Sequence, residues 1–137
     1  MCWITSKIPD LKIVDKPIKV YKIFRGSFEK LSSLLYPYDW IPGEIRHQKI
    51  GKVISEKTLS RTRYRINEGF HSFICLPKIE PININESYIE TSYSFIAFDN
   101  KEIIVCECEI PKGSLYYINK CGEIVSNKLK IIECVKS

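Results

Sequence analysis

The sequence predicts an α+β fold, built mainly from an antiparallel sheet with one or two short helices. Segments in which apolar and polar residues alternate recur along the chain, and turns rich in glycine, proline and asparagine separate the later ones. Two other segments carry apolar residues at helical spacing. With 137 residues, of which 45% are hydrophobic, the chain is expected to form a single domain over residues 1–137.

The predicted strands rest on this alternation. Residues 17–25 and 102–110 are the clearest examples, because β-branched and aromatic side chains are frequent in both. Turn signals then separate two further strands, at residues 114–118 and 123–135. The carboxy-terminal third is therefore expected to be an antiparallel meander.

Helices are predicted for two segments. Residues 27–35 begin with a serine that can cap a short helix, and leucines follow at helical spacing. Residues 83–98 are expected to contain a second helix, with 85–97 as its body. There Ser87 and Glu90 fit a capping box that precedes further apolar residues at helical spacing.

Cysteine content and the amino terminus favour a cytoplasmic protein with no membrane partner. No apolar run approaches the ~20 residues that span a bilayer, and the amino terminus lacks the features of a signal peptide. In a reducing compartment the six cysteines are expected to be thiols. Removal of Met1 would make Cys2 an amino-terminal thiol beside its own amine, the pairing used by amino-terminal hydrolases, and the sequence leaves this processing open.

The net charge of +5 favours an anionic partner. The lysines are scattered, so nucleic acid is the less favoured partner, and an anionic small molecule or a protein is preferred. The only dense basic run holds Arg61, Arg63 and Arg65, which alternation would place on one strand face. That face is either solvated or binds an anion.

The stretch from Tyr64 to Pro77 contains the first candidate for chemistry. Gly69 is expected to form a turn that places His71 and Ser72 at the mouth of a cleft, floored by the strand at residues 17–25. Either residue would then bind a ligand or serve in general acid–base catalysis. The alternative is a histidine held in the core by a single hydrogen bond.

Strand 102–110 carries the second candidate. Cys106 and Cys108 share one face, and Cys121 and Cys134 could approach to complete a zinc site, but buried thiols are favoured and no metal is expected. Glu107 and Glu109 share the opposite face, where they are either exposed or suited to acid–base catalysis.

A set of donors along the chain could bind an anion such as a nucleotide, a phosphate or an acidic protein surface. Two adjacent tyrosines must face opposite ways in a strand, so one is expected to pack and the other to reach the ligand. The predicted ligand-binding residues are Arg25, Arg65, His71, Ser72, Lys112, Tyr116 and Tyr117.

The Met1-Cys2 start, Gly69-Phe-His-Ser72 and Ile110-Pro-Lys-Gly-Ser-Leu-Tyr-Tyr117 resemble motifs of a family of small uncharacterised proteins from bacteria and their phages. The resemblance spans most of the chain and implies the host cytoplasm as location if the protein is phage-encoded. Since the family has no assigned activity, the resemblance names a group and implies no reaction.

A more distant likeness is to ADP-ribosyltransferase-like folds. In these a basic residue, a Ser or Tyr and a Glu from three strands surround a nicotinamide nucleotide, roles that the resemblance gives to Arg25, Ser72 and Glu107 or Glu109. The middle motif departs from the family pattern, reading Gly-Phe-His-Ser where Ser-Thr-Ser is usual.

The preferred function is a binding or host-interaction protein, without a cofactor, that sequesters an anionic nucleotide or engages a host protein. The alternative is an ADP-ribosyltransferase-like enzyme that uses a nicotinamide dinucleotide. The sequence predicts no oligomeric state.

Overall fold

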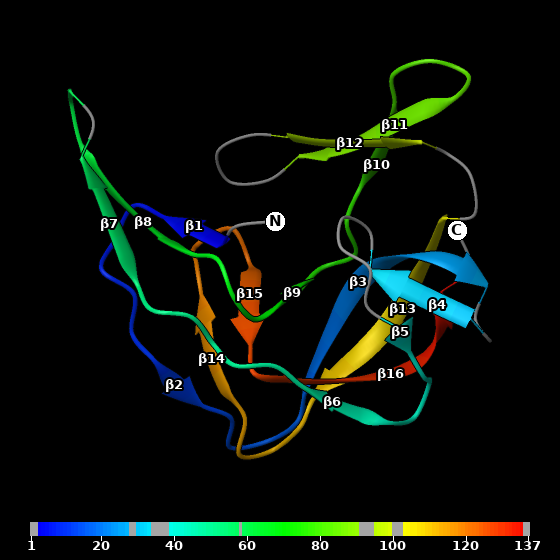
Figure 1. The fold of residues 1–137 in the computed structure, drawn as a ribbon, viewed down its shortest axis with the longest axis horizontal. Coiled ribbons are helices and arrows are strands. Elements are labelled where there is room, and N and C mark those ends of the chain that lie inside the picture. The colour runs from blue at the N-terminus through cyan, green and yellow to red at the C-terminus, as the bar shows by residue number, and fades with distance from the viewer. Residues whose placement is uncertain are drawn as a thin grey trace.

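The computed structural model describes residues 3–27, 30–33, 39–57, 59–90, 95–99 and 103–135. Every regular element within these ranges is a strand, and antiparallel pairing arranges the strands in three sheets (Figure 1). The prediction of a mainly antiparallel sheet is therefore confirmed.

The largest sheet is formed by strands from both ends of the chain. Its order is β2 (Lys12–Ile13), β14 (Leu115–Ile118), β15 (Glu123–Ser126), β9 (Phe70–Phe73), β3 (Ile18–Ser27), β13 (Ile103–Ile110), β16 (Lys128–Val135) and β6 (Ile45–His47). Residues 24–27 of β3 also pair with β4 (Lys30–Ser33), and β4 pairs with β5 (Asp39–Trp40). The predicted strands at 17–25, 102–110 and 114–118 are thus present within the described residues. The predicted meander is wrong, because β14 pairs with β15 but β13 pairs with β3 and β16, and β15 pairs with β9.

The sheet curls because β15 and β16 form one stretch of chain that bends at Asn127. The amide N of Asn127 donates to the carbonyl O of Leu115 over 3.1 Å, and its side-chain Oδ1 accepts from the amide N of Leu115 at 2.8 Å. Before this bend the chain pairs with β9 and β14, and after it the chain pairs with β13 and β6. One segment of chain therefore contributes a strand to each half of the strand order.

The inner face of the curled sheet carries the main core. Trp40, on β5, packs between Phe24 and Phe70, with ring centroids 5.4 and 4.9 Å away. The cluster contains Val14, Val20, Phe24, Leu31, Trp40, Phe70, Cys106, Cys108, Ile110, Ile124, Leu129 and Ile131. We call the face that bears these residues the interior face, and the opposite one the outer face.

Two three-stranded sheets cover the outer face. The first consists of β1 (Trp3–Thr5), β8 (Thr62–Ile66) and β7 (Ile54–Lys57), and it buries Trp3 and Ile66 against Tyr117 and Val125. The second consists of β10 (Ile79–Pro81), β11 (Glu86–Glu90) and β12 (Phe95–Asp99), and it buries Ile89 and Phe98 against Ile23.

Both helix predictions are wrong for the residues that the structure describes. Residues 30–33 form β4, whose Leu31 faces Gly26 and is buried in the main core. In place of the helix at 83–98, β11 and β12 pair with Ser87 opposite Phe98, and the supposed capping box lies within a strand. Alternating burial along β11, with Ser87 and Ile89 buried, is the period of a strand. The rest of each predicted helix lies outside the described ranges, and within those ranges no helix that could span a membrane is found.

Gly69 provides a test of the turn that precedes β9. Its φ is +131°, and a Cβ there would lie 2.5 Å from Cγ2 of Val125, which has no exposed surface. We expect Gly69→Ala to lower the free energy of unfolding by more than about 2 kcal/mol, from backbone strain and overpacking together.

Gly113→Ala is the matched control, because φ is +87° but no atom lies within 4 Å of the added methyl group. Its free energy of unfolding should fall only by the contribution from backbone strain, about 1 kcal/mol. Urea denaturation of both variants measures the difference, and equal losses would show that the contact with Val125 relaxes without cost.

Candidate functional site

A surface groove of about 430 Å³ lies beside the bend at Asn127. One wall is the segment that leaves β6, and the other is the start of β14. The groove is lined by His47, Gln48, Lys49, Ile50, Leu115 and Asn127. Its volume falls within the range of small-molecule sites, roughly 300 to 1,000 Å³.

Backbone hydrogen bonds fix the first wall at both ends. The amide N of Gln48 donates to the carbonyl O of Asn127, and the amide N of Gly51 donates to the carbonyl O of Glu68, each over 2.9 Å. Between these anchors Ile50 packs against the outer cluster around Trp3. The wall is therefore held against the sheet.

The groove combines an apolar surface with hydrogen-bond donors. Ile50 and Leu115 supply the apolar part, while Lys49 supplies a cation that forms no ion pair within the described ranges. Lys128, directly opposite His47 in the β16–β6 ladder, is likewise without an ion pair there. The Oδ1 atom of Asn127 is occupied by Leu115, and its Nδ2 group has no partner in the described part of the chain. Such a set of donors suits an anion.

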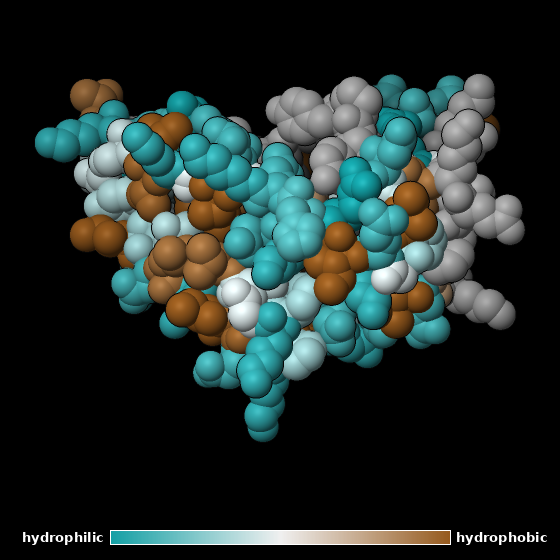
Figure 2. All heavy atoms as spheres, turned by 60° about the horizontal axis from the view of Figure 1, so that its bottom comes forward, coloured by the Kyte–Doolittle hydropathy of each residue, from teal (hydrophilic) through white to brown (hydrophobic). Residues whose placement is uncertain are grey.

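Exposed apolar residues adjoin the groove. Ile13 of β2 pairs with Leu115 and is 65% exposed, and Leu11, which immediately precedes β2, is 50% exposed. In Figure 2, which brings the bottom of Figure 1 forward, apolar atoms gather on the left, the side on which Figure 1 draws β2 and β14. A ligand in the groove would thus meet apolar surface beside the cations.

The predicted anion donors do not converge. Arg25 lies opposite Ile103 at one end of β13 and forms an ion pair with Asp99 at 3.1 Å. Lys112 is exposed in the turn that follows Ile110, at the other end of β13. The strand between them is roughly 23 Å long, since a strand rises about 3.3 Å per residue.

The residues proposed for nicotinamide nucleotide chemistry are also separated. Ser72 faces Ile124 on the interior face and is 1% exposed. Glu107 alternates with the buried Cys106 and so lies on the outer face, where it forms an ion pair with Lys19 at 2.9 Å. Glu109 lies on that outer face too. The sheet itself stands between the serine and the carboxylates.

His71 is buried, not placed at the mouth of a cleft as the sequence predicted. It is 8% exposed, and its Nε2 atom has no hydrogen-bond partner among the residues that the structure describes. Burial, assisted by the nearby Lys22 ammonium, lowers the pKa of His71 from 6.5 to about 3. A neutral, enclosed imidazole corresponds to the core histidine that the sequence left as the alternative.

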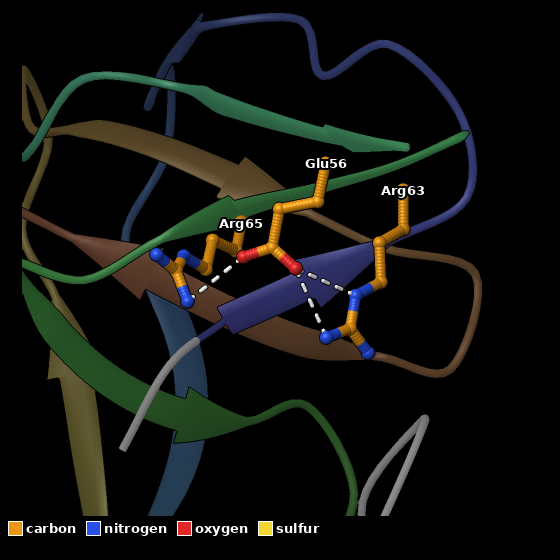
Figure 3. A network of polar contacts seen from close by, with 3 residues as sticks. All are labelled: Glu56, Arg63 and Arg65. Carbon is orange, nitrogen blue, oxygen red and sulfur yellow. Dashed lines mark hydrogen bonds and ion pairs between the residues drawn. The ribbon is translucent and has the colours of Figure 1, made fainter. Parts of the chain in front are cut away.

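Arg65 lies on β8 in an ion-pair network with Arg63 and Glu56. Figure 3 shows both guanidinium groups turned toward Glu56. Nε and Nη2 of Arg63 each lie 3.0 Å from Oε2, and Nη1 of Arg65 lies 2.8 Å from Oε1. Arg63 and Arg65 share one face of β8, as predicted, whereas Arg61 precedes the strand. The carboxylate of Glu56 already occupies Arg63 and Arg65.

The two tyrosines face opposite ways, as predicted. Tyr116 packs on the interior cluster, whereas Tyr117 is buried on the outer face, 5.9 Å from the ring of Trp3. Neither lines the groove.

The five described cysteines are thiols. Cys106 and Cys108 are fully buried on the interior face, and burial raises the pKa of both. Cys121 and Cys134 are exposed, and the described residues include no cluster of three or more metal-ligating side chains.

The groove residues were missed by sequence reasoning. Residues 45–53 contain three cationic residues and no acidic one, which was the available signal. Alternation there is weak, so the pattern did not connect these residues with Leu115 or Asn127.

Comparison of the chain with protein-family models, with curated proteins and with solved structures finds no match.

The burial of His71 predicts that the free energy of unfolding depends on pH. Because its pKa is lowered on folding, the unfolded chain binds more protons between about pH 6.5 and pH 3, so stability falls as pH falls through this window. We expect His71→Gln, which removes the titrating group, to flatten this part of the profile. Denaturation from pH 7 to pH 3.5 measures it.

The matched control is His47→Gln, because His47 is exposed. It should leave the profile unchanged. If both variants follow the wild-type profile, the imidazole of His71 is not buried in solution.

The ion-pair network on β7 and β8 predicts a small, salt-dependent loss of stability when its carboxylate is removed. Glu56→Gln should lower the free energy of unfolding by about 1 kcal/mol at low salt, because it leaves two guanidinium groups side by side, and by less in 1 M salt.

Glu44→Gln serves for comparison, since Glu44 is 49% exposed and lies 3.5 Å from Arg46. Glu44→Gln should lower the free energy of unfolding by less than Glu56→Gln does. An effect of Glu56→Gln that does not change with salt would refute the electrostatic explanation.

Proposed function

We propose that the protein is a non-enzymatic binding protein that holds an anionic ligand of the nucleotide type in the groove beside Asn127. The observation that carries the proposal is the composition of the groove, in which Lys49 and the Asn127 amide stand beside Ile50 and Leu115. A phosphate would meet the donors, and a base or sugar would meet the apolar wall.

Catalysis has less support from the geometry. The imidazole of His71 is enclosed and neutral, and Ser72 lies on the opposite side of the sheet from Glu107 and Glu109. A reaction needs its acid, base and nucleophile within hydrogen-bond reach of one substrate. The resemblance to small proteins of bacteria and their phages adds a setting for the proposal, in which sequestering a nucleotide in the host cytoplasm is a function that needs no turnover.

Titration of the protein with pyrophosphate, AMP and a nicotinamide dinucleotide tests the proposal. We expect at least one probe to shift the amide NMR signals of residues 47–50, 115 and 127. Lys49→Gln should weaken that probe about tenfold, the loss expected for one charge-assisted hydrogen bond.

Lys112→Gln is the matched control, because Lys112 is an exposed lysine outside the groove. It should bind like the wild type. Equal weakening by both variants would indicate general charge attraction. Binding of polyglutamate but of no phosphate would point to an acidic protein partner, and release of nicotinamide from the dinucleotide would show an enzyme. Each of these results would overturn the proposal.

A further inference from the structure

Four reactive side chains, far apart in the sequence, form a row across the interior face. Tyr21 faces Phe73 across β3 and β9, which makes Lys22 and Ser72 neighbours on the other side of those strands. Lys22 in turn lies opposite Cys106, and Cys106 lies opposite Cys134. The row therefore ends in two thiols on adjacent strands.

The position of the two thiols suits a disulfide. Directly opposite residues of an antiparallel pair have Cα atoms about 4.5 or 5.5 Å apart, and a disulfide accepts Cα separations of about 4.4 to 6.8 Å. Their side chains leave the same face. The nearby Cys134 also contributes to the raised pKa of Cys106, as expected for neighbouring groups.

The two thiols differ in their access to solvent. Cys106 has no exposed surface, whereas Cys134 is exposed. The reason lies in the strand order, because β6 pairs with β16 only from Lys128 to Lys130 and leaves the later part of that edge uncovered in the described structure. An oxidant would reach Cys134 first.

The ladder is also adaptable at this point. Its register shifts between Glu107 and Cys108, where β16 carries one extra residue. A bulge interrupts the hydrogen-bond ladder and lets a strand bend. The small approach of the two Cβ atoms that a disulfide requires can be absorbed there.

We propose that Cys106 and Cys134 form a reversible disulfide, which makes them an oxidisable thiol pair that links β13 to β16. With glutathione disulfide as the oxidant, the Cys134 thiolate attacks one of its sulfurs and releases one glutathione thiolate. Cys106 then loses its proton and attacks the Cys134 sulfur in the mixed disulfide, which releases the second glutathione. Two protein thiols are thus oxidised and one glutathione disulfide is reduced to two glutathione molecules.

The test begins from the full chain carrying Cys75→Ser and Cys121→Ser. Cys75 is adjacent to Ile74 and Cys121 is adjacent to Gly122, and the amide N of Ile74 donates to the carbonyl O of Gly122. Replacing both cysteines prevents a second disulfide at this end of the β9–β15 ladder. The protein is incubated at low concentration in glutathione buffers of increasing oxidised fraction, alkylated, digested and analysed by mass spectrometry.

We expect a peptide pair linked between Cys106 and Cys134, in a protein of monomeric mass two hydrogens lighter, that dithiothreitol reverses. The linked form should also unfold at higher urea concentration. Cys108→Ser should preserve the link, because Cys108 lies opposite Ile131.

Cys134→Ser changes an exposed residue, so it should fold normally and leave Cys106 as a thiol under the same conditions. Three results would overturn the proposal: a stable glutathione adduct on Cys134 with Cys106 still reduced, a dimer linked through Cys134, or no reaction up to fully oxidised buffer.

Discussion

The bend at Asn127 is the constraint on which the fold and the groove both depend. Both the backbone amide and the side-chain oxygen of Asn127 are bonded to Leu115, which holds β14 against the point where one strand becomes two. Its carbonyl oxygen accepts from Gln48, which fixes the first wall of the groove. The residue that closes the sheet thus also assembles the candidate site.

The interior that this closure creates is not wholly apolar. Lys22 extends between Val20 and Phe24, and its Nζ donates to the carbonyl O of His71 over 2.7 Å. Burial lowers the pKa of Lys22 to about 8, the direction expected when an ammonium loses water. One strong hydrogen bond offsets part of that cost, whereas the buried Oγ of Ser72 has no hydrogen-bond partner within the described part of the chain. Ser72 and Lys22 therefore place polar groups, one of them unsatisfied among the described residues, within a largely apolar core.

Local patterns in the sequence predicted the features that depend only on residues adjacent along the chain. The alternation of Cys106 and Glu107, the opposite directions of Tyr116 and Tyr117, and the turn at Gly69 all follow from strand geometry. The prediction of a helix at 83–98 was wrong because apolar residues three and four apart also occur in a strand when both faces of the strand contact other residues. Burial of Ile89 against Ile23 decides between the two, and no local pattern contains that contact.

The candidate site was beyond the sequence for the same reason. Its walls come from residues 47–50 and from Leu115, which only the bend at Asn127 brings together. Arg25 and Arg65 were attractive donors because the sequence did not show their acidic partners. Asp99 is 74 residues from Arg25 along the chain, and Glu56 reaches Arg65 through the pairing of β7 with β8.

The distribution of these partners explains where the excess positive charge remains. The chain carries a net charge of +5, and carboxylates occupy the guanidinium groups of Arg25, Arg63 and Arg65. No carboxylate pairs with Lys49 or Lys128 within the described ranges. Other lysines, such as Lys112, also form no ion pair within the described ranges. Lys49 differs because it stands beside Ile50 and Leu115, and this combination of a cation with apolar surface distinguishes the groove from the arginine-rich strand.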